Sequence, residues 1–325
     1  MKLEIRSGRP LPFRKRKISV RKIFLILFLC LYSSNCFAEI SFLREQKLLN
    51  DLNKDASQGS EYPIILHHGF LGFRKILLLE YFYKVPEFLR QRGYEVFVTQ
   101  VHPLASIERR AEELAQQIDE ILKISGKQKV NIIAHSMGGL DGRYLIGKMG
   151  YQDKIASLSM ISTPNQGSYL ADIVASTLKG EEKVRKRLFG LMQVPDDPQS
   201  SLFSQAMEAV YNCSKNFIQD EFNAQVKDRA EVYYQSWAGV STPSGGKRAD
   251  ILDPIFFVPY ILIKIKHGSN DGVVSVDSAK WGHFRGTIPA SHLHQVGFWF
   301  GLPSSGFNHK QFYKQVAQGL AMKGF

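Results

Sequence analysis

The strongest constraint on how this chain can fold lies in a stretch of eleven residues, 130–140. Residues 130–133 predict a short apolar strand, and the residues after Gly139 predict a helix. Between them stands Ser136. Ala134 and Gly138 occupy the positions two residues to either side, where larger side chains would clash in a tight strand-to-helix turn. We therefore expect a serine hydroxyl exposed at the carboxyl end of a strand. The alternative is an ordinary helix start with small residues for close packing.

A second turn could supply the partners that such a serine needs. Residues 63–66 predict another buried strand, which leads into His67-His68-Gly69-Phe70. A His-Gly turn in this place can present backbone N–H groups to an oxyanion, although a glycine turn without a catalytic part has the same sequence. The two histidines could also suggest a metal pair. We reject that hypothesis because adjacent residues on a strand point to opposite faces.

The remaining chain alternates predicted strands with predicted helices, which indicates a mostly parallel sheet with helices on both faces. Further strands are expected at 94–101, 155–161 and 232–240, and helices at 73–93, 107–124 and 309–322. The alternation lapses at about 168–228, which we interpret as an inserted helical cap or lid over the active-site face. Its apolar stripe suits contact with lipid or with the core of the protein. Residues 39–61 form an N-terminal extension, and 62–325 form the main domain.

The positive charge of the chain is concentrated at its amino terminus. The net charge is +12 over 325 residues, but residues 1–38 hold nine Lys or Arg and one acid, so the rest carries only +4 and implies no nucleic-acid partner. The basic segment, the apolar run 23–32 and the small residues that follow predict a signal peptide cut after Ala38. An uncleaved anchor, a lipoprotein site at Cys36 and a nuclear signal at 14–17 are the alternatives. After cleavage only Cys213 remains, so we expect no internal disulfide and a structural thiol.

A nucleophilic serine needs a base, and the base needs an acid that fixes its tautomer. Five histidines follow Ser136, namely His267, His283, His292, His294 and His309. Of these, His292 and His294 lie in a loop-like segment late in the chain, where the base belongs. The acid candidate Asp271 stands in an Asn-Asp-Gly loop just after the expected strand, although such a loop is also common as a plain Asx turn. Asp250, Asp253 and Asp277 compete with it for the role of acid.

Taken together, these segments resemble the Pseudomonas-type bacterial triacylglycerol lipases. The resemblance rests on residues 63–72, 96–99, 129–139, 270–274 and 292–296, and it extends over about 62–178 and 222–325. It implies an α/β-hydrolase fold with Ser136 as the nucleophile, Asp271 as the acid and His292 as the base. It also implies an oxyanion hole formed by the backbone N–H groups of Phe70 and Met137.

The chain departs from this family at the structural calcium site that the resemblance implies. The family holds Ca²⁺ through two aspartates and two carbonyl oxygens; Asp253 matches the first aspartate, and Leu302 could offer a carbonyl. However, His294 stands in place of the second aspartate, and Phe298 in place of a glutamine. Because Ca²⁺ prefers several oxygen ligands, we predict that this site is lost and that the protein needs no cofactor. His294 could hydrogen-bond Asp253 instead. The disulfide of the family is absent too, since Asp277 occupies a cysteine position.

The function predicted from these features is that of a secreted or envelope serine lipase. It would cleave acyl esters of lipids of the triacylglycerol type through an acyl-serine intermediate. Its expected partners are the lipid–water interface and, as a candidate, a secretion chaperone or foldase. The alternatives on the same triad are a short-chain esterase, a phospholipase and an acyltransferase. A non-catalytic binding module and a membrane-anchored interaction protein are the alternatives of another class.

Overall fold

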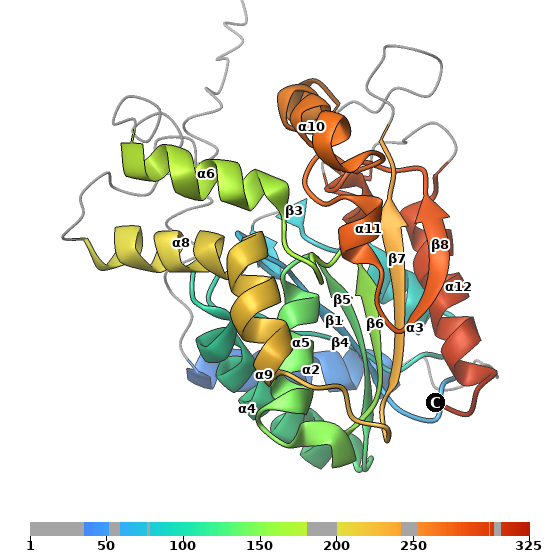
Figure 1. The fold of residues 1–325 in the computed structure, drawn as a ribbon. Coiled ribbons are helices and arrows are strands. Elements are labelled where there is room, and N and C mark those ends of the chain that lie inside the picture. Colours follow the sequence, from blue (N-terminus) through green and yellow to red (C-terminus); the bar gives the residue numbers. More distant parts are fainter. Residues whose placement is uncertain are drawn as a thin grey trace, which may run out of the picture.

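The computed structural model describes residues 36–51, 59–76, 79–180, 200–241, 253–298, 300–301 and 307–325. Its centre is a six-stranded sheet in the order β4-β1-β5-β6-β7-β8, in which every pair of neighbours is parallel (Figure 1). The strands are β1 (Ile64–His67), β4 (Val96–Val98), β5 (Val130–His135), β6 (Ile155–Ile161), β7 (Tyr233–Gly239) and β8 (His283–Ile288). The predicted mostly parallel sheet is therefore confirmed.

The central strands are apolar on both sides because helices cover both faces of the sheet. Every residue of β1, β4, β5 and β6 is buried. Successive residues of a strand enter opposite cores: Ile64 and Leu66 pack with helices α3 (Val85–Arg90) and α12 (His309–Ala321), whereas Ile65 packs with the other helices. Those helices are α2 (Cys36–Asp51), α4 (Ile107–Ser125) and α5 (Gly138–Gly147), and a short 3₁₀ turn, η1 (Tyr151–Asp153), precedes β6.

The N-terminal extension forms the helix α2, which closes one edge of the sheet. Gln46 and Asn50 lie one helical turn apart and are buried against β4. The Gln46 amide donates to Val98 O (3.2 Å) and accepts from Val98 N–H (2.7 Å), and Asn50 makes the same two bonds with Val96, at 3.1 and 3.0 Å. An exposed edge strand invites pairing with another chain. The two amides therefore replace the missing strand. Residues 1–35, with most of the predicted signal peptide, lie outside the described part of the chain, and 36–38 belong to α2.

The secondary structure differs from the expectation along residues 73–93 and at β8. Residues 73–93 were expected to be helical, but they contain a small antiparallel hairpin, β2 (Lys75–Ile76) and β3 (Leu79–Glu80), before α3 begins at Val85. Pro86 suits the first turn of α3, where no N–H is needed, and it prevents the helix from continuing from an earlier start. The edge strand β8 was missed altogether. Its residues alternate between exposed and partly buried, so it lacks the apolar run that marked the central strands.

The region 168–228 is mostly helical where the structure describes it, with residues 181–199 outside the description. It contains α6 (Tyr169–Gly180), α8 (Ser201–Asn212), the π-helix η2 (Phe217–Phe222) and α9 (Asn223–Gln225). Partly buried apolar side chains of α6 and α8, among them Val174, Leu202 and Met207, cluster with Phe70 and Leu71 of the turn after β1. This part of the insertion therefore packs on the rim of the site. The predicted apolar stripe at 184–192 lies outside the described residues.

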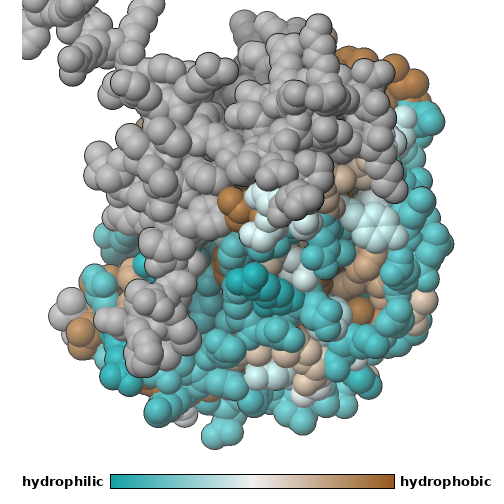
Figure 2. Space-filling model, turned by 90° about the vertical axis from the view of Figure 1, so that its left-hand side faces the viewer, coloured by the Kyte–Doolittle hydropathy of each residue, from teal (hydrophilic) through white to brown (hydrophobic). Residues whose placement is uncertain are grey.

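A further helix, α10 (Asp253–His267), stands between β7 and the loop of Asp271, followed by α11 (Val276–Ala279) and the 3₁₀ turn η3 (His294–Val296). Figure 1 places α6 and α10 above the ends toward which the strand arrows point. In the space-filling view of Figure 2, brown residues stand out at the top edge, at the height of α10, above a largely teal surface. Among the described residues, no helix is both long enough and apolar enough to cross a bilayer.

Candidate active site

Ser136 occupies the tight turn that its sequence predicts, between β5 and α5. Its backbone has φ = 57°, a left-handed conformation that a non-glycine residue adopts only under strong constraint from its surroundings. The Ser136 N–H donates to Ile161 O (2.9 Å), which ties the turn to β6. The neighbouring glycine is required by space, because a Cβ at Gly138 would lie 2.6 Å from His68 O. The serine hydroxyl is thereby held at the amino end of α5, where the helix dipole favours negative charge.

The structure brings Ser136, His292 and Asp271 into one chain of hydrogen bonds. His292 Nε2 lies 2.9 Å from Ser136 Oγ, and His292 Nδ1 lies 2.7 Å from Asp271 Oδ2. The His292 N–H also donates to Asp271 O (3.0 Å). Since the carboxylate accepts the proton on Nδ1, Nε2 is left to accept the proton of the serine hydroxyl. These three residues, 156 positions apart at the extremes, have the geometry of a charge relay.

The Asp271 carboxylate is fully buried and accepts several hydrogen bonds. Besides His292, Gln295 Nε2 donates to Oδ2 (2.8 Å), and the N–H groups of Val273 and Val274 donate to Oδ1 at 3.0 and 2.8 Å. Burial by itself raises the pKa of Asp271. The charge and hydrogen bond of His292 and the two backbone donors outweigh burial and leave the pKa below its ordinary value. Asp271 is therefore a carboxylate at neutral pH.

Competing acids and bases that the structure describes have other partners. The Asp277 side chain is 79% exposed and pairs with Lys280, and His309 hydrogen-bonds Tyr83 O (2.9 Å). Asp250 and the side chain of Asp253 lie outside the described residues. The residues 253–267 before Asp271 form the helix α10 and no strand, so the acid does not directly follow a strand in sequence. It is nevertheless held at the end of β7, where Ser241 N–H donates to Asn270 O (2.9 Å).

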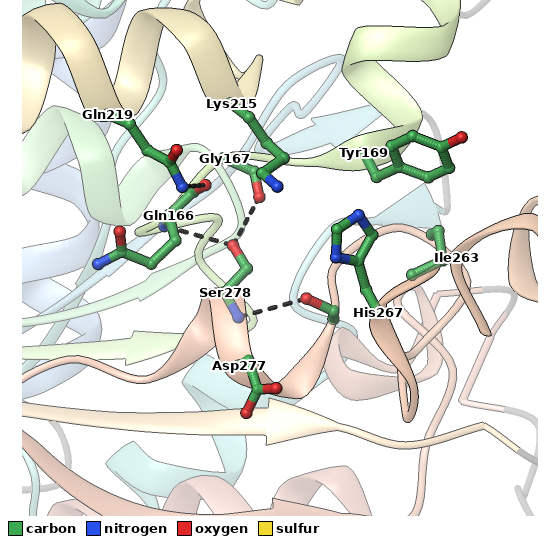
Figure 3. Close-up of a pocket in the computed structure, with 10 residues that line it drawn as sticks. Gln166, Gly167, Tyr169, Lys215, Gln219, Ile263, His267, Asp277 and Ser278 are labelled. Carbon is green, nitrogen blue, oxygen red and sulfur yellow. Dashed lines mark hydrogen bonds between the residues drawn. The ribbon is translucent and has the colours of Figure 1, made fainter. Parts of the chain in front are cut away.

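A cavity of about 180 Å³ lies between α6, α10 and α11 (Figure 3). Tyr169, Lys215, His267, Asp277 and Ser278 are among the residues that line it. Ser136 and His292 are not among them. Two of the residues considered for the relay, His267 and Asp277, therefore face this cavity and not the serine.

The turn after β1 lies directly against Ser136, as the His-Gly motif predicts. A Cβ at Gly69 would lie 2.7 Å from Ser136 Cβ and 3.2 Å from Met137 N. The neighbouring N–H groups of the turn are used, since Gly69 donates to the Tyr81 hydroxyl (3.2 Å) and Leu71 to Pro103 O (2.9 Å). In the described part of the chain, the N–H groups of Phe70 and Met137 take part in no hydrogen bond. Two free donors thus flank the serine.

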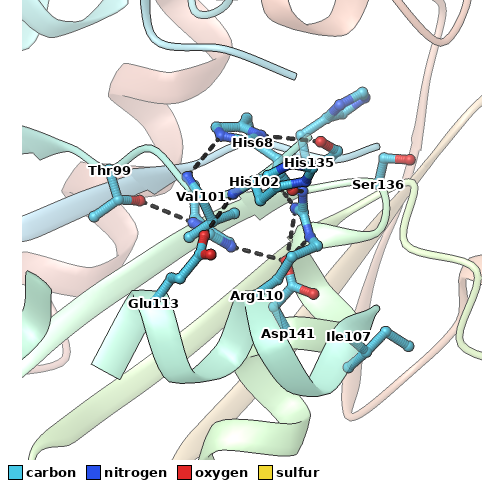
Figure 4. A network of polar contacts seen from close by, with 12 residues as sticks. His68, Thr99, Val101, His102, Ile107, Arg110, Glu113, His135, Ser136 and Asp141 are labelled. Atoms are coloured by element: carbon cyan, nitrogen blue, oxygen red, sulfur yellow. Dashed lines mark hydrogen bonds and ion pairs between the residues drawn. The ribbon is translucent and has the colours of Figure 1, made fainter. Parts of the chain in front are cut away.

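Behind the turn lies a buried ionic network that sequence reasoning missed (Figure 4). Arg110 of α4 donates from Nε (2.9 Å) and Nη2 (2.7 Å) to Asp141 Oδ2 of α5, and from Nη2 to His68 O (2.8 Å). His67 Nε2 lies 2.9 Å from the same carboxylate oxygen. Arg110, Asp141 and His67 are fully buried. The only sequence signal was an arginine on the apolar side of an amphipathic helix, between Ile107 and Leu114.

The two adjacent histidines do not have the geometry that was expected of them. Their rings are 5.7 Å apart and stacked at 26° to each other. The expectation that the two side chains point to opposite faces of the strand was therefore wrong. His68 follows the last residue of β1 and is no longer bound by the alternation of a strand. All four ring nitrogens have protein partners. His67 contacts Thr99 Oγ1 and Asp141, and His68 contacts Gly69 O and the Val101 N–H.

A second group missed from the sequence connects the turn to the neighbourhood of His292. The Tyr81 hydroxyl accepts from Gly69 N–H (3.2 Å) and lies 2.7 Å from His135 Nδ1. The His135 ring in turn lies 4.6 Å from the His292 ring. Burial, together with the charge of His292, holds the pKa of His135 well below its ordinary value. The Nδ1 atom of a neutral His135 can accept a hydrogen bond from the Tyr81 hydroxyl, which fixes both side chains.

Of the residues that the family resemblance assigns to a calcium site, the structure describes the side chains of His294 and Phe298. His294 is buried in η3 and offers ring nitrogens where an oxygen ligand would be needed. Phe298, which replaces the expected glutamine, packs its ring 6.1 Å from that of Phe73 in the core. Leu302 and the Asp253 side chain lie outside the described residues. Cys213 is half-buried at the end of α8, and desolvation raises the pKa of its thiol to about 12, as suits a structural cysteine.

Comparisons with known proteins agree with this architecture. Residues 62–194 match the family model described as the alpha/beta hydrolase fold. A triacylglycerol lipase of Vibrio cholerae is 28% identical over 304 residues, which cover 88% of this chain and 93% of the relative. Triacylglycerol lipase 2 of Saccharomyces cerevisiae is 31% identical over 288 residues, which cover 78% and 77%. The solved mature form of a Bacillus licheniformis lipase has a TM-score of 0.62 at 19% identity and covers 83% and 96%.

The parallel sheet and the matched family model define the class of this protein as an α/β hydrolase. Within that class, the chain belongs to the triacylglycerol lipase family, and it is a carboxylic ester hydrolase. The fold class and the resemblance predicted from the sequence are thereby confirmed.

Proposed function

We propose that this protein is a secreted serine lipase that cleaves acyl esters of lipids through an acyl-Ser136 intermediate. The observation that carries the proposal is the hydrogen-bonded chain from Ser136 through His292 to Asp271, with distances of 2.9 and 2.7 Å. The lipid substrate is supported by the relatives, which are named triacylglycerol lipases. The basic and apolar residues 1–38 support export. A secretion chaperone or foldase remains a candidate partner.

In the first half of the reaction, Ser136 Oγ attacks the ester carbonyl carbon while His292 Nε2 takes the hydroxyl proton. The negative charge that develops on the carbonyl oxygen is stabilised by the N–H groups of Phe70 and Met137 and by the amino end of α5. One such donor is typically worth about 3 kcal/mol in the transition state. Asp271 stabilises the imidazolium without taking its proton. When the C–O bond of the leaving alcohol breaks, His292 returns the proton to that alcohol.

In the second half, water resolves the acyl-enzyme by the same steps. His292 Nε2 takes a proton from water as the oxygen attacks the acyl carbon, and it returns that proton to Ser136 Oγ as the acyl–serine bond breaks. The products are a free fatty acid and the regenerated serine. An acceptor alcohol in place of water would make the protein an acyltransferase. A preference for short acyl chains would make it a short-chain esterase, and a preference for phospholipids would make it a phospholipase. No calcium is needed in this proposal, because His294 replaces an oxygen ligand.

The test is hydrolysis of an ester series from short to long acyl chains by the full chain and by its Ser136→Ala variant. We expect turnover to rise with chain length and to fall at least about 10⁴-fold in the variant, whose folding is checked by circular dichroism. Fatty acid and acyl-transfer products are quantified separately. A preference for the shortest esters would indicate an esterase. Turnover that survives Ser136→Ala would reject the mechanism, and no turnover by either folded protein would favour a binding module.

A further inference from the structure

The helix α10 is anchored to the loop that carries Asp271. A Cβ at Gly272 would lie 2.6 Å from Phe256 Cβ, so the helix and the loop are in direct contact. Asn270 Nδ2 donates to Tyr260 O (3.2 Å). On the same inner side, Ile263 is only 1% exposed. The inner face of α10 is therefore held in place next to the proposed reaction centre.

The outer face of α10 is apolar and exposed to solvent. Five large side chains stand out, at spacings of one and four residues that place them in one stripe: Phe257 (47% exposed), Val258 (64%), Ile261 (39%), Leu262 (39%) and Ile265 (77%). Single exposed apolar residues are ordinary on protein surfaces, but a contiguous stripe marks a contact surface. The helix α10 also stands above the carboxyl ends of the strands, the edge of the sheet at which Ser136 follows β5.

The charges on α10 indicate what the stripe contacts. Lys264 and Lys266 are exposed near its end, and residues 255–267 contain no acidic side chain. An apolar stripe bordered by lysines matches the boundary between acyl chains and negatively charged headgroups, where lysine stems lie along the apolar region and the ammonium groups reach the headgroups. Fifteen residues span about 22 Å, too short for a hydrocarbon core of about 30 Å. The helix can therefore lie in the surface but not cross it.

We propose that α10 is an interfacial helix that lays its outer stripe into the surface of a negatively charged lipid aggregate. This inference rests on the proposed lipid-ester hydrolysis, because that function brings the protein to such a surface. Contact through α10 turns the carboxyl edge of the sheet toward the lipid. Since α10 also packs against Gly272, the loop of Asp271 is held at the interface together with it.

The test places a reporter on the stripe in the full-length Ser136→Ala chain, which cannot consume the lipid. One variant carries Phe257→Trp. The matched control carries Met322→Trp, at an 89% exposed position at the end of α12, next to the C-terminus that Figure 1 marks far from α10. Both are mixed with vesicles of phosphatidylcholine and phosphatidylglycerol that carry bromine on their acyl chains. We expect the bromine to quench the fluorescence added at position 257 and not the fluorescence added at 322. The three native tryptophans and the leader are common to both variants.

Two further variants test the contacts separately. Ile265→Ser removes an apolar side chain from the stripe and should lower the vesicle partition coefficient about tenfold. Lys264→Glu combined with Lys266→Glu should weaken binding to the mixed vesicles at least about fivefold per lysine and leave binding to pure phosphatidylcholine nearly unchanged. The Lys123→Glu control, on α4, should change neither the binding to mixed vesicles nor the binding to pure phosphatidylcholine.

The outcomes separate this proposal from the function on which it rests. Vesicle binding without quenching at position 257, or with equal quenching at position 322, overturns the role of α10. If ester turnover still depends on Ser136 in that case, the proposed function stands and only the interfacial helix is rejected. Turnover that survives Ser136→Ala rejects the proposed function, and with it the ground for a lipid partner.

Discussion

Arg110 and Asp141 form an ion pair whose side chains have no exposed surface, with Arg110 Nη2 2.7 Å from Asp141 Oδ2. The pair joins α4 to α5, the helix that begins just after Ser136. Through its bond to His68 O, the same guanidinium also holds the turn that presents the Phe70 N–H. One buried charge therefore fixes the distance between the two donors proposed for the oxyanion.

Breaking this pair on one side should be far more damaging than replacing it. Asp141→Asn leaves the buried Arg110 charge without its counter-charge, and we expect a loss of about 3–5 kcal/mol in the free energy of unfolding, measured with urea. Arg110→Met combined with Asp141→Leu should recover much of that loss. Asp119→Asn, which removes an exposed partner of Lys154, should cost less than about 1 kcal/mol. Equal losses in the two single variants would contradict the structural role of the buried pair.

Gly69→Ala tests how closely the turn approaches the serine. Its methyl group would lie 2.7 Å from Ser136 Cβ, so the turn must move and carry the Phe70 N–H out of place. We expect kcat to fall about 10²–10³-fold, the loss typical of one oxyanion donor. Gly319→Ala is the control, because nothing lies within 4 Å of its added Cβ in α12. A Gly69→Ala enzyme with unchanged kcat would place the donors elsewhere.

Tyr81→Phe removes one hydroxyl with two buried partners. The Gly69 N–H and His135 Nδ1 both lose their hydrogen bonds, so we expect a loss of about 1–3 kcal/mol in the free energy of unfolding and a lower kcat. Tyr151→Phe removes a hydroxyl whose partner is the half-exposed Asp119, and it should change stability by no more than about 0.5 kcal/mol. If Tyr81→Phe changed the free energy of unfolding no more than Tyr151→Phe does, the Tyr81–His135 hydrogen bond would not contribute to stability.

Asp271 predicts a dependence of stability on pH. Its pKa is lowered in the folded protein, so the carboxylate stabilises the fold at pH values above the ordinary pKa of about 3.9. That contribution is lost as the pH falls through the lowered value. We therefore expect the stability advantage over Asp271→Asn, measured by urea unfolding, to be large near neutral pH and to shrink in acid. An advantage that stays constant with pH would show that the charge of Asp271 does not contribute.

Removal of divalent cations should have no effect. A chelator added to the protein should change neither the ester turnover nor the midpoint of thermal unfolding, because His294 and Phe298 stand where calcium would need oxygen donors. The measurement compares both quantities with and without chelator, and again after excess Ca²⁺ is restored. A loss that calcium reverses would show that Asp253 and backbone carbonyls suffice for a site.

Local sequence was sufficient for the turn of Ser136 and the elements on either side of it. The apolar run before Ser136, the small residues around it and the periodicity of α4 predicted β5, the turn and the helix. The choice of Asp271 among four acids could not come from spacing, because it depends on donors brought together by the fold. Val273 and Val274 are close in sequence, but Gln295 and His292 come from a different segment. The family resemblance supplied that information in place of geometry.

Three features could not be predicted from the sequence: the strand β8, the buried Arg110 and the role of α2. Each of them depends on contacts with distant parts of the chain. β8 is an edge strand whose side chains are half exposed, so its sequence carries no apolar run. The partner of the buried Arg110 could not be read from the helix, since its counter-charge on Asp141 lies 31 residues away in sequence. The role of α2 was hidden as well, because Gln46 and Asn50 are polar residues that become buried only by pairing with the backbone of β4.

The tether between Ser241 and Asn270 makes the segment between them a replaceable part. Both ends of the excursion are fixed at the end of β7, where Ser241 N–H donates to Asn270 O (2.9 Å), so a substitute segment has only to reproduce the inner contacts of α10 with Asn270 and Gly272. Evolution, or an engineer, can therefore exchange α10 for another helix with a different outer face. The surface that the protein contacts can be changed in this way while the chemistry proposed for Ser136 is inherited intact.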